Sequence, residues 1–224
     1  MCSSDLVTSP FKKRDHDVAS AYEYKGFTLH LKNTGPHGFN CFSEDVEAIV
    51  NAANTGMLGG GGIDGAINSF CTRTKLAKER SYLKQNFQVQ VGGAFYTQAY
   101  TFSENAKAVA ALVSKGRTLL PAGQTQGSIK NIIHTVGPQG SANEENDFRL
   151  AMAFYNSLVL ADRLGLKSIV FPGISIGIFG YDVDHASTAY LAGIKLFMDE
   201  HPDSELKDIR IIANNYSKLC SIIS

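Results

Sequence analysis

A run of four glycines, Gly59–Gly62, separates a β-branched stretch from a segment with helical spacing, in IVNAANTGMLGGGGIDGAI. Glycine in a fixed element costs about 0.5–1 kcal/mol relative to alanine, so four in succession need a functional reason. A strand that ends near Asn51, a glycine loop and a helix that begins near Ile63 form an arrangement that binds phosphate groups. The backbone N–H groups approach an anion without a Cβ in the way, and the helix N-terminus adds a favourable dipole. The loop is therefore predicted to bind an anion.

A second loop of the same kind follows the apolar stretch KSIVFP. Ser175–Gly180 (SIGIFG) links that stretch to a predicted helix, so its amides can also face an anion. In open α/β sheets, ligands lie beyond the carboxyl ends of the strands. Two such loops on adjacent strands would bind a diphosphate from both sides, with Phe179 placed to pack on a sugar. The pair of loops therefore predicts a nucleotide-like ligand.

Other motifs compete for these residues. Gly60, Gly62 and Gly65 satisfy G-x-G-x-x-G, but a dinucleotide site needs its first glycine directly after the strand, and an acidic residue at the end of a second strand. No Gly-Lys-Ser/Thr follows, which excludes a P-loop. Gly173–Gly177 (GISIG) matches the nucleophile elbow of serine hydrolases, but only one good strand remains after it to carry an acid and a histidine. The sequence therefore favours phosphate binding.

The elements that position these loops alternate between strands and helices. Continuous Ile/Val stretches predict strands that are covered on both faces, as in parallel sheets. The predicted strands are Gly26–Lys32, Glu47–Ala52, Phe87–Tyr100, Lys130–Val136, Lys167–Pro172 and Asp208–Ala213. Apolar spacing of three and four predicts helices over Ile63–Phe70, Phe148–Val159 and Ala186–Met198, with Gly165 and Pro202 as stops. The alternation predicts one layered α/β domain with a mostly parallel sheet.

Composition narrows the class of partner. The chain has 224 residues, and its 21 basic and 21 acidic residues balance, so no global field indicates nucleic acid or an anionic membrane as a partner. The four cysteines show no metal-ligand spacing, so no metal and no cofactor are expected and the thiols are predicted to be reduced. No stretch has the pattern of a signal peptide or a membrane span, which favours a cytoplasmic location. Residues 1–24 are predicted to be a polar extension, and residues 25–224 a single domain with an insertion at about 101–128.

Three stretches together resemble the macrodomain family of ADP-ribose-binding modules: Ile49–Ile67, Asn131–Pro138 (NIIHTVGP) and Ser168–Tyr181. The asparagine pattern, followed by four glycines and Asp64, is similar to the MacroD-type subgroup, whose members are mono-ADP-ribosyl hydrolases and O-acetyl-ADP-ribose deacetylases. The resemblance implies a three-layer α/β/α fold with a mixed, mostly parallel sheet. It also implies ADP-ribose or an ADP-ribosylated protein as the partner. The insertion is expected to cover the site or to bind a protein partner.

The resemblance also implies the site residues. Asn54 would hydrogen-bond the distal ribose and Asp64 would position or activate the attacking water, so these two are the candidate catalytic residues. The candidate ADP-ribose-binding residues are Asn40, Cys41, Ala52, Asn54, Gly60, Gly61, Gly62, Ile63, Ser175, Ile176, Gly177, Ile178, Phe179 and Gly180. From the residues alone, Asp64 has a second interpretation, because an acid in the first turn of a helix stabilises its dipole by about 0.3–1 kcal/mol. Asn54 likewise has a second interpretation as a turn-former.

The sequence departs from the family at the adenine end. The family usually carries Gly-Asp-Ile where this chain has Phe39-Asn40-Cys41, and a neutral Asn40 is expected to weaken adenine binding by about 1 kcal/mol. Tyr216 is the one aromatic residue near the C-terminal strand that could stack on adenine. Three functions stay open at this point. They are hydrolysis of carboxylate-linked ADP-ribose or O-acetyl-ADP-ribose, non-catalytic reading of ADP-ribose, and hydrolysis of another linkage such as arginine-linked ADP-ribose.

Overall fold

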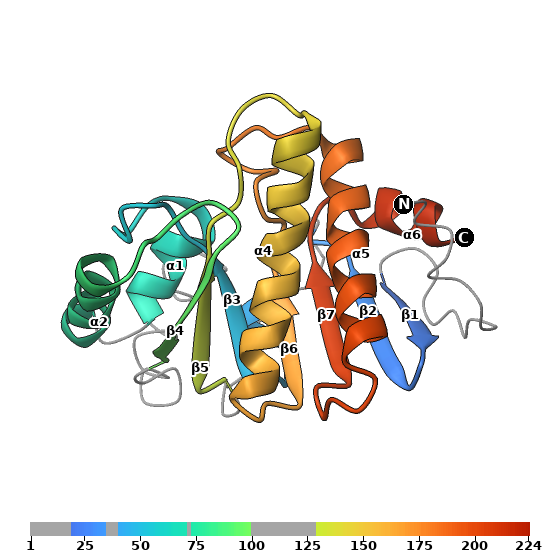
Figure 1. Ribbon diagram of the computed structural model, residues 1–224, viewed down its shortest axis with the longest axis horizontal. Coiled ribbons are helices and arrows are strands. Elements are labelled where there is room, and N and C mark those ends of the chain that lie inside the picture. Colours follow the sequence, from blue (N-terminus) through green and yellow to red (C-terminus); the bar gives the residue numbers. More distant parts are fainter. Residues whose placement is uncertain (1–18, 35–39, 71–72, 100–128) are drawn as a thin grey trace, which may run out of the picture.

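A mixed sheet, seven-stranded among the residues that the structure describes, forms the centre of the protein (Figure 1). The computed structural model describes residues 19–34, 40–70, 73–99 and 129–224. The strands, in the spatial order β1-β2-β7-β6-β3-β5-β4, are β1 (Ala19–Tyr24), β2 (Phe27–Lys32), β7 (Asp208–Ile212), β6 (Ser168–Phe171), β3 (Ala48–Ala52), β5 (Asn131–Thr135) and β4 (Ala94–Gln98). The edge strands β1 and β4 run antiparallel to their neighbours, whereas the inner pairs are parallel. The predicted mostly parallel sheet is confirmed.

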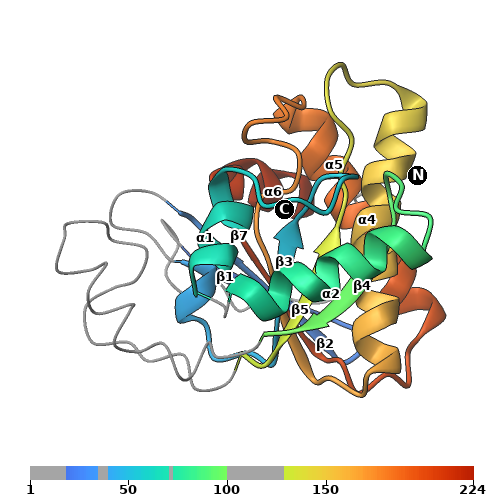
Figure 2. The same ribbon diagram turned by 90° about the vertical axis from the view of Figure 1, so that its left-hand side faces the viewer.

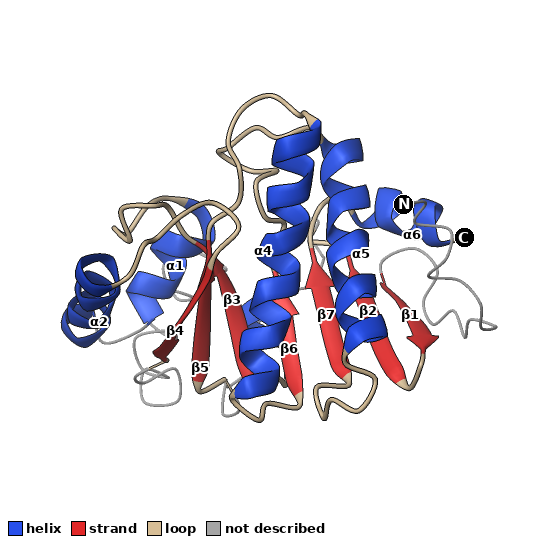
Figure 3. Cartoon of the chain, viewed as in Figure 1, coloured by secondary structure: helices blue, strands red, loops and turns tan. Residues whose placement is uncertain are grey.

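Helices cover both faces of this sheet, which gives the three layers that the sequence predicts (Figures 2 and 3). The long helices α4 (Glu144–Arg163) and α5 (Val183–Glu200) lie side by side on one face. On the opposite face lies α1 (Gly62–Phe70), with α2 (Arg73–Asn86) beside it along β4. The short helices α6 (Tyr216–Ile223) and η2 (Cys41–Ser43) complete the described elements. α6 packs against α5 and β2.

The central strands separate two apolar cores. In β3, Ala48 and Val50 face the core under α4 and α5, whereas Ile49 faces the core under α1. The Phe154 ring of α4 stacks on Phe171 of β6 at 4.4 Å between ring centroids, and on Tyr190 of α5 at 4.2 Å. Full burial of a large apolar side chain is worth about 1.5–3 kcal/mol. The continuous Ile/Val stretches of the sequence therefore correspond to strands that are buried on both faces.

The predicted stop of α4 at Gly165 is confirmed. Gly165 has a φ of 71°, and its N–H donates to the Asp162 carbonyl at 2.9 Å while Leu166 donates to the Ala161 carbonyl at 3.1 Å. This is the left-handed glycine ending by which helices satisfy their last carbonyls. At the other end, the Asn143 side chain accepts from the Asn146 N–H and caps α4. The α5 helix likewise ends two residues before Pro202.

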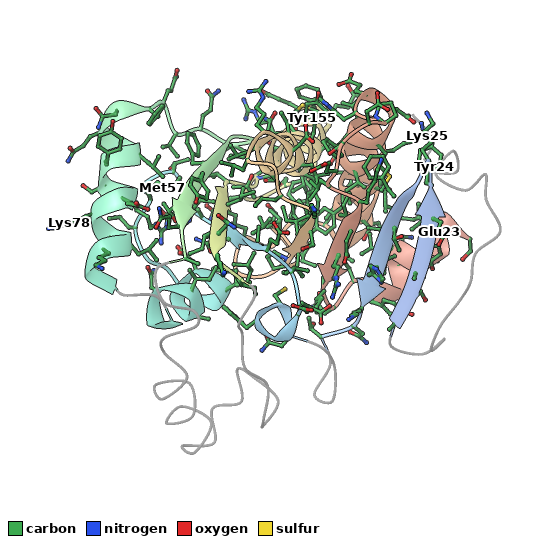
Figure 4. All side chains as sticks on the ribbon, turned by 90° about the horizontal axis from the view of Figure 1, so that it is seen from below. Glu23, Tyr24, Lys25, Met57, Lys78 and Tyr155 are labelled. Atoms are coloured by element: carbon green, nitrogen blue, oxygen red, sulfur yellow. The ribbon has the colours of Figure 1, made fainter. Side chains whose placement is uncertain are left out.

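Two predictions about element bounds are wrong. The last six residues of the predicted polar extension, Ala19–Tyr24, form the edge strand β1, because Lys25 and Gly26 adopt positive φ and turn this segment into a hairpin with β2. Glu23, Tyr24 and Lys25 lie at this edge, and Lys78 lies on α2 at the other end of the protein (Figure 4). The predicted strand Phe87–Tyr100 contains only β4, because Gly92, at a φ of 90°, directs the chain into the strand from a turn. The insertion at about 101–128 and residues 1–18 lie outside the described residues.

The order of the strands places the two loops side by side. β3 and β6 are parallel neighbours, with Ala48 opposite Ile169 and Ile49 opposite Val170. The loop after β3 and the loop after β6 therefore leave the sheet at the same edge, as the sequence predicts. Within the described part of the chain, none of the helices has the length and apolar character needed to cross a bilayer.

Candidate functional site

A cavity of about 280 Å³ lies between the loop after β3 and the loop after β6. Its lining residues are Ala52, Ala53, Asn54, Gly60, Gly61, Gly62, Ile63, Asp64, Gly173, Ser175, Gly177, Ile178 and Phe179. Both candidate catalytic residues, Asn54 and Asp64, are among them. The two loops thus meet around one space, although they are far apart in the sequence.

A second cavity of about 350 Å³ adjoins the first, and Gly62, Ile63, Gly173 and Gly177 line both. We call the two cavities together the cleft. The second cavity also contacts Asn40, Cys41, Phe42, Ile176 and residues that follow β7. Every candidate ligand residue except Gly180 lines the cleft. Gly180 shapes the loop, with a φ of 64° and an N–H that donates to the Gly177 carbonyl at 3.0 Å.

The structure supplies reasons for the glycine run besides ligand approach. A Cβ on Gly59 would lie 2.3 Å from Nδ2 of Asn68, so a larger residue there would displace that side chain. Gly62 begins α1 at a φ of 58°, a conformation that costs other residues roughly 1–2 kcal/mol. The run therefore combines close packing against α1 with a left-handed turn into its first residue.

Asn54 holds the loop that leads to the glycines. Its amide Nδ2 donates to the Leu58 carbonyl at 2.8 Å, and the Leu58 N–H donates to its Oδ1 at 3.2 Å. The Asn54 carbonyl also accepts from the Met57 N–H at 3.0 Å. Asn54 therefore forms the turn that the second interpretation expects, while its side chain also lines the cleft.

Asp64 lies in the first turn of α1 and is only 3% exposed. Its Oδ1 accepts from Nη1 of Arg80 at 2.6 Å and from Nδ2 of Asn51 at 2.9 Å. Its Oδ2 accepts from Nη2 of Arg80 at 3.2 Å and from the Gly60 N–H at 3.1 Å. These four hydrogen bonds use the roughly four acceptor positions of a carboxylate.

Arg80 is the site residue that sequence reasoning missed. It lies in α2, in the polar stretch LAKERS, yet it is 1% exposed and is among the largest fully buried side chains of the described residues. Its Nη2 also donates to the Leu58 carbonyl at 3.3 Å. The sequence offers a weak signal, because an acidic residue beside a predicted anion-binding loop calls for a compensating cation, and Arg is the residue most suited to a buried ion pair.

A chain of buried polar groups continues from Asp64 into the sheet. Nδ2 of Asn51 is also 3.0 Å from Nδ1 of His134, whose Nε2 is 2.8 Å from Oγ1 of Thr97. Burial, together with the nearby Arg80 charge, lowers the pKa of His134 from 6.5 to about 3. The imidazole is therefore neutral, and it accepts at Nδ1 from Asn51 and donates at Nε2 to Thr97.

The loop after β6 has a fixed and strained shape. Ser175 has a φ of 67°, and its carbonyl accepts from the Tyr181 N–H at 3.0 Å. The Phe179 carbonyl accepts from the Gly140 N–H at 3.2 Å. Gly137 is required nearby, since a Cβ there would lie 2.1 Å from Oγ of Ser175. The hydroxyl of Ser175, buried at the cleft, has no hydrogen-bond partner among the described residues.

The geometry argues against a serine-hydrolase triad. The imidazole of His134 contacts Asn51 and Thr97, and Nδ1 of His185 lies 2.8 Å from Oδ2 of Asp147. Within the described ranges, neither histidine is engaged with Ser175. The strained serine thus lines the cleft without the base that a nucleophile requires.

The second cavity of the cleft carries Asn40 and Cys41, for which the resemblance implies contacts with adenine. Asn40 caps η2, and its Oδ1 accepts from the Phe42 N–H at 2.9 Å. Cys41 is buried, and burial raises the pKa of its thiol. Tyr216, by contrast, is buried beside β1, with its hydroxyl 2.8 Å from Oγ of Ser20, and it does not line the cleft. The suggestion that Tyr216 stacks on adenine is therefore wrong.

Each of the two loops carries one largely exposed aliphatic side chain. Leu58 is 70% exposed and Ile178 is 77% exposed. Ile178 reaches across to the other loop, because a Cβ on Gly61 would lie 2.9 Å from its Cδ1. Across the ranges that the structure describes, no cluster of three or more His, Cys, Asp or Glu side chains could hold a metal ion.

Comparisons with known proteins agree with this geometry. A family model described as Macro domain matches residues 50–118 and 115–190. A Cronobacter sakazakii protein named O-acetyl-ADP-ribose deacetylase is 35% identical, over 70% of this chain and 74% of its own length. An uncharacterized Thermotoga maritima protein is 33% identical over 87% of this chain, which spans only 28% of that protein's length.

A solved structure of an Oceanobacillus iheyensis macrodomain variant with ADPR is 25% identical, with a TM-score of 0.69, and the alignment covers 92% of this chain and 96% of that one. Fold, loop placement and sequence similarity therefore lead to the same family. The chain belongs to the macrodomain family.

Proposed function

We propose that the protein binds ADP-ribose in the cleft and hydrolyses an ester linkage at its distal ribose. The substrates would be mono-ADP-ribose on acidic side chains of proteins, O-acetyl-ADP-ribose, or both. The observation that carries the proposal is the continuous cleft, which two amide-rich loops from the adjacent parallel strands β3 and β6 enclose. The name of the Cronobacter sakazakii relative and the ADPR in the Oceanobacillus iheyensis structure support this choice of ligand.

The ligand is proposed to lie along the cleft with its diphosphate between the two loops. Backbone amides of Gly60–Ile63 would face it from one side, and those of Ser175–Gly180 from the other. The distal ribose would then lie in the first cavity, beside Asn54 and Phe179. The adenine would lie in the second cavity, beside Asn40 and Cys41. This placement uses both cavities of the cleft.

The proposed reaction adds water across an ester. Water attacks either the anomeric carbon, which breaks the ribose–oxygen bond, or the ester carbonyl, which breaks the acyl–oxygen bond. In both cases the products are a carboxylic acid and ADP-ribose. A water molecule held in line with the bond is the main requirement, since positioning alone lowers barriers strongly. Asn54 is proposed as the residue that contacts the distal ribose and the reacting group.

Asp64 is proposed to position the site and not to accept the proton of the water. All of its acceptor positions are filled by Arg80, Asn51 and the Gly60 N–H. A general base needs a free lone pair within hydrogen-bond reach of the proton that it takes. The same observation favours a second candidate function, that of a non-catalytic reader of ADP-ribose or ADP-ribosylated proteins.

Two measurements separate these functions. Calorimetric titration of the full chain with ADP-ribose tests binding, and absence of binding would reject both candidate functions. Release of ADP-ribose from an automodified transferase with carboxylate linkages, and of acetate from O-acetyl-ADP-ribose, tests hydrolysis. A hydrolase loses turnover in Asn54→Ala but keeps it in Glu145→Ala, which changes an exposed ion pair with Arg149 on α4. A reader binds ADP-ribose and releases neither product.

A further inference from the structure

We propose that Arg80 is a positioning residue of the cleft, which neutralises Asp64 and holds the glycine loop in its anion-receiving shape. The inference rests on the proposed ADP-ribose function and adds a residue that does not line the cleft. Three features of the described structure carry it: the contacts of the guanidinium, its burial, and its connection to Asn54.

One guanidinium joins three parts of the site. Its Nη1 and Nη2 contact the two carboxylate oxygens of Asp64 at 2.6 and 3.2 Å. Nη2 also donates to the Leu58 carbonyl at 3.3 Å, directly before the glycine run, and Nη1 lies 3.5 Å from Oδ1 of Asn68. The planar fork of arginine allows this simultaneous contact, which the single ammonium of lysine cannot reproduce.

The charge of Arg80 offsets a carboxylate that would otherwise oppose the ligand. Asp64 lines the cleft, where a diphosphate would bring negative charges close to it. The Arg80–Asp64 ion pair is buried, because the two side chains are only 2% and 4% exposed. Water and salt screen such a buried pair poorly, so the positive charge of Arg80 acts at nearly full strength on Asp64.

Arg80 and the side chain of Asn54 share the Leu58 carbonyl as a hydrogen-bond acceptor. The Leu58 carbonyl accepts from Nδ2 of Asn54 at 2.8 Å and from Nη2 of Arg80 at 3.3 Å. The Leu58 N–H donates back to Oδ1 of Asn54 at 3.2 Å. A rotation of the Leu58–Gly59 peptide would move the carbonyl that accepts from the Asn54 amide, and the hydrogen bond from Arg80 restrains that rotation.

The test compares affinities for ADP-ribose and adenosine in Arg80→Met, Arg80→Lys and the double variant Asp64→Asn/Arg80→Met. Adenosine is the neutral probe, because it has no diphosphate. Lys84→Met is the matched control, since Lys84 also leads from α2 to this region, where its Nζ donates to the Thr55 carbonyl at 2.9 Å, but it is exposed. The double variant keeps the measurement possible where the unpaired carboxylate of Arg80→Met prevents folding.

Arg80→Met is expected to weaken ADP-ribose binding by about tenfold or more, because the diphosphate would then lie near an uncompensated carboxylate. Adenosine binding should weaken by less than about threefold, Arg80→Lys should be intermediate, and Lys84→Met should match the wild type. The double variant should regain most of the lost affinity, because it removes the uncompensated charge. Arg80→Met that binds ADP-ribose like the wild type would overturn the inference, as would equal losses for both ligands.

Hydrogen exchange of the free protein provides a readout that does not depend on the ligand. Arg80→Met should speed exchange of the Gly60–Ile63 amides relative to Lys84→Met, since the loop loses the hydrogen bond from Arg80 to the Leu58 carbonyl. Unchanged exchange there overturns the inference even if the wild-type protein does not bind ADP-ribose. Absence of binding by the wild type rejects the proposed function instead, so the two failures are distinguishable.

Discussion

The guanidinium of Arg80 lies end-on to the carboxylate of Asp64 beneath the glycine loop, with Nη1 2.6 Å from Oδ1 and Nη2 3.2 Å from Oδ2. This pair resolves a conflict in the sequence, where an acidic residue follows a loop that is built to bind an anion. The carboxylate is compensated by a cation from the next helix, so it can fix the loop without repelling the ligand. The pair also has consequences for stability that can be measured apart from binding.

Replacing only Arg80 should lower the free energy of unfolding far more than replacing both Arg80 and Asp64. Arg80→Met leaves the buried carboxylate unpaired and is expected to lower the free energy of unfolding by about 3–5 kcal/mol. Asp64→Asn/Arg80→Met should recover most of that loss, because neither residue then carries a charge. Denaturant unfolding of both variants checks the prediction. A double variant that is as unstable as Arg80→Met would show that packing, and not charge, stabilises this position.

ADP-ribose affinity should fall both when the Asn54 amide is removed and when a negative charge replaces it. Asn54→Ala removes both hydrogen bonds to Leu58, and Asn54→Asp replaces the donor to the Leu58 carbonyl with a carboxylate oxygen. We expect Asn54→Asp to bind ADP-ribose more weakly than Asn54→Ala, by about tenfold at low salt, since it adds a repulsive charge. Calorimetry at two salt concentrations checks this, because screening should narrow the difference.

The control for this comparison is Asn86→Asp. Asn86 also donates from its amide to a backbone carbonyl, that of Tyr82 at 2.9 Å, but it is exposed at the end of α2. The Asn86→Asp variant should bind ADP-ribose with the affinity of the wild type. Equal affinities for the Ala and Asp variants of Asn54 would contradict a placement of the diphosphate near this residue.

Replacement of Gly65 by alanine should destabilise the protein, although Gly65 lies within α1. A Cβ there would lie 2.6 Å from the carbonyl oxygen of Gly60, so the glycine loop would have to move. Alanine gains about 1 kcal/mol of helix propensity, but overpacking against backbone costs typically 1–3 kcal/mol. We expect Gly65→Ala to reduce both stability and ADP-ribose affinity. Ser81→Ala on α2 is the control, expected to stay within about 0.5 kcal/mol of the wild type.

His134 should make the protein sensitive to acid. Its pKa is lowered from 6.5 to about 3 in the folded state. Between these values the unfolded chain binds a proton that the folded chain does not, so the free energy of unfolding falls as the pH falls. The slope should approach about 1.4 kcal/mol per pH unit for this group and should end near the folded pKa.

The variant His134→Gln isolates this contribution. It removes the titrating group, so the slope of stability against pH between about 6.5 and 3 should decrease by nearly one proton equivalent. Denaturant unfolding at several pH values gives the slope for both proteins. Titration of His30, whose pKa burial also lowers, is common to both proteins and cancels in the difference. Identical slopes would show that folding does not lower the pKa of His134.

The sequence predicts the loops and strands well because local patterns encode them. Continuous apolar stretches identify β3, β5 and β6, and the glycine run identifies the loop between β3 and α1. The helix stop at Gly165 follows from a residue that tolerates positive φ. Each of these features depends on a few consecutive residues and on the edge of the sheet at which parallel strands end.

Arg80 and β1 escape prediction for the opposite reason. No residue adjacent to Arg80 in the sequence indicates that it is buried, since α2 is polar along most of its length. The partner of Arg80, Asp64, lies in the preceding helix α1. β1 is a short edge strand whose alternation became meaningful only when paired with β2. The contacts that decide both are long-range, and periodicity within one segment does not contain them.

The adjacency of β3 and β6 has a consequence for when the cleft forms during folding. The two halves of the cleft come from strands that are distant along the chain, so a large loop must close before they meet. Nascent or truncated chains that lack β6 would expose the first loop without its opposing wall. The ability to bind a ligand would therefore arise late in folding. A ligand would stabilise fully folded molecules and would not affect the earlier folding steps.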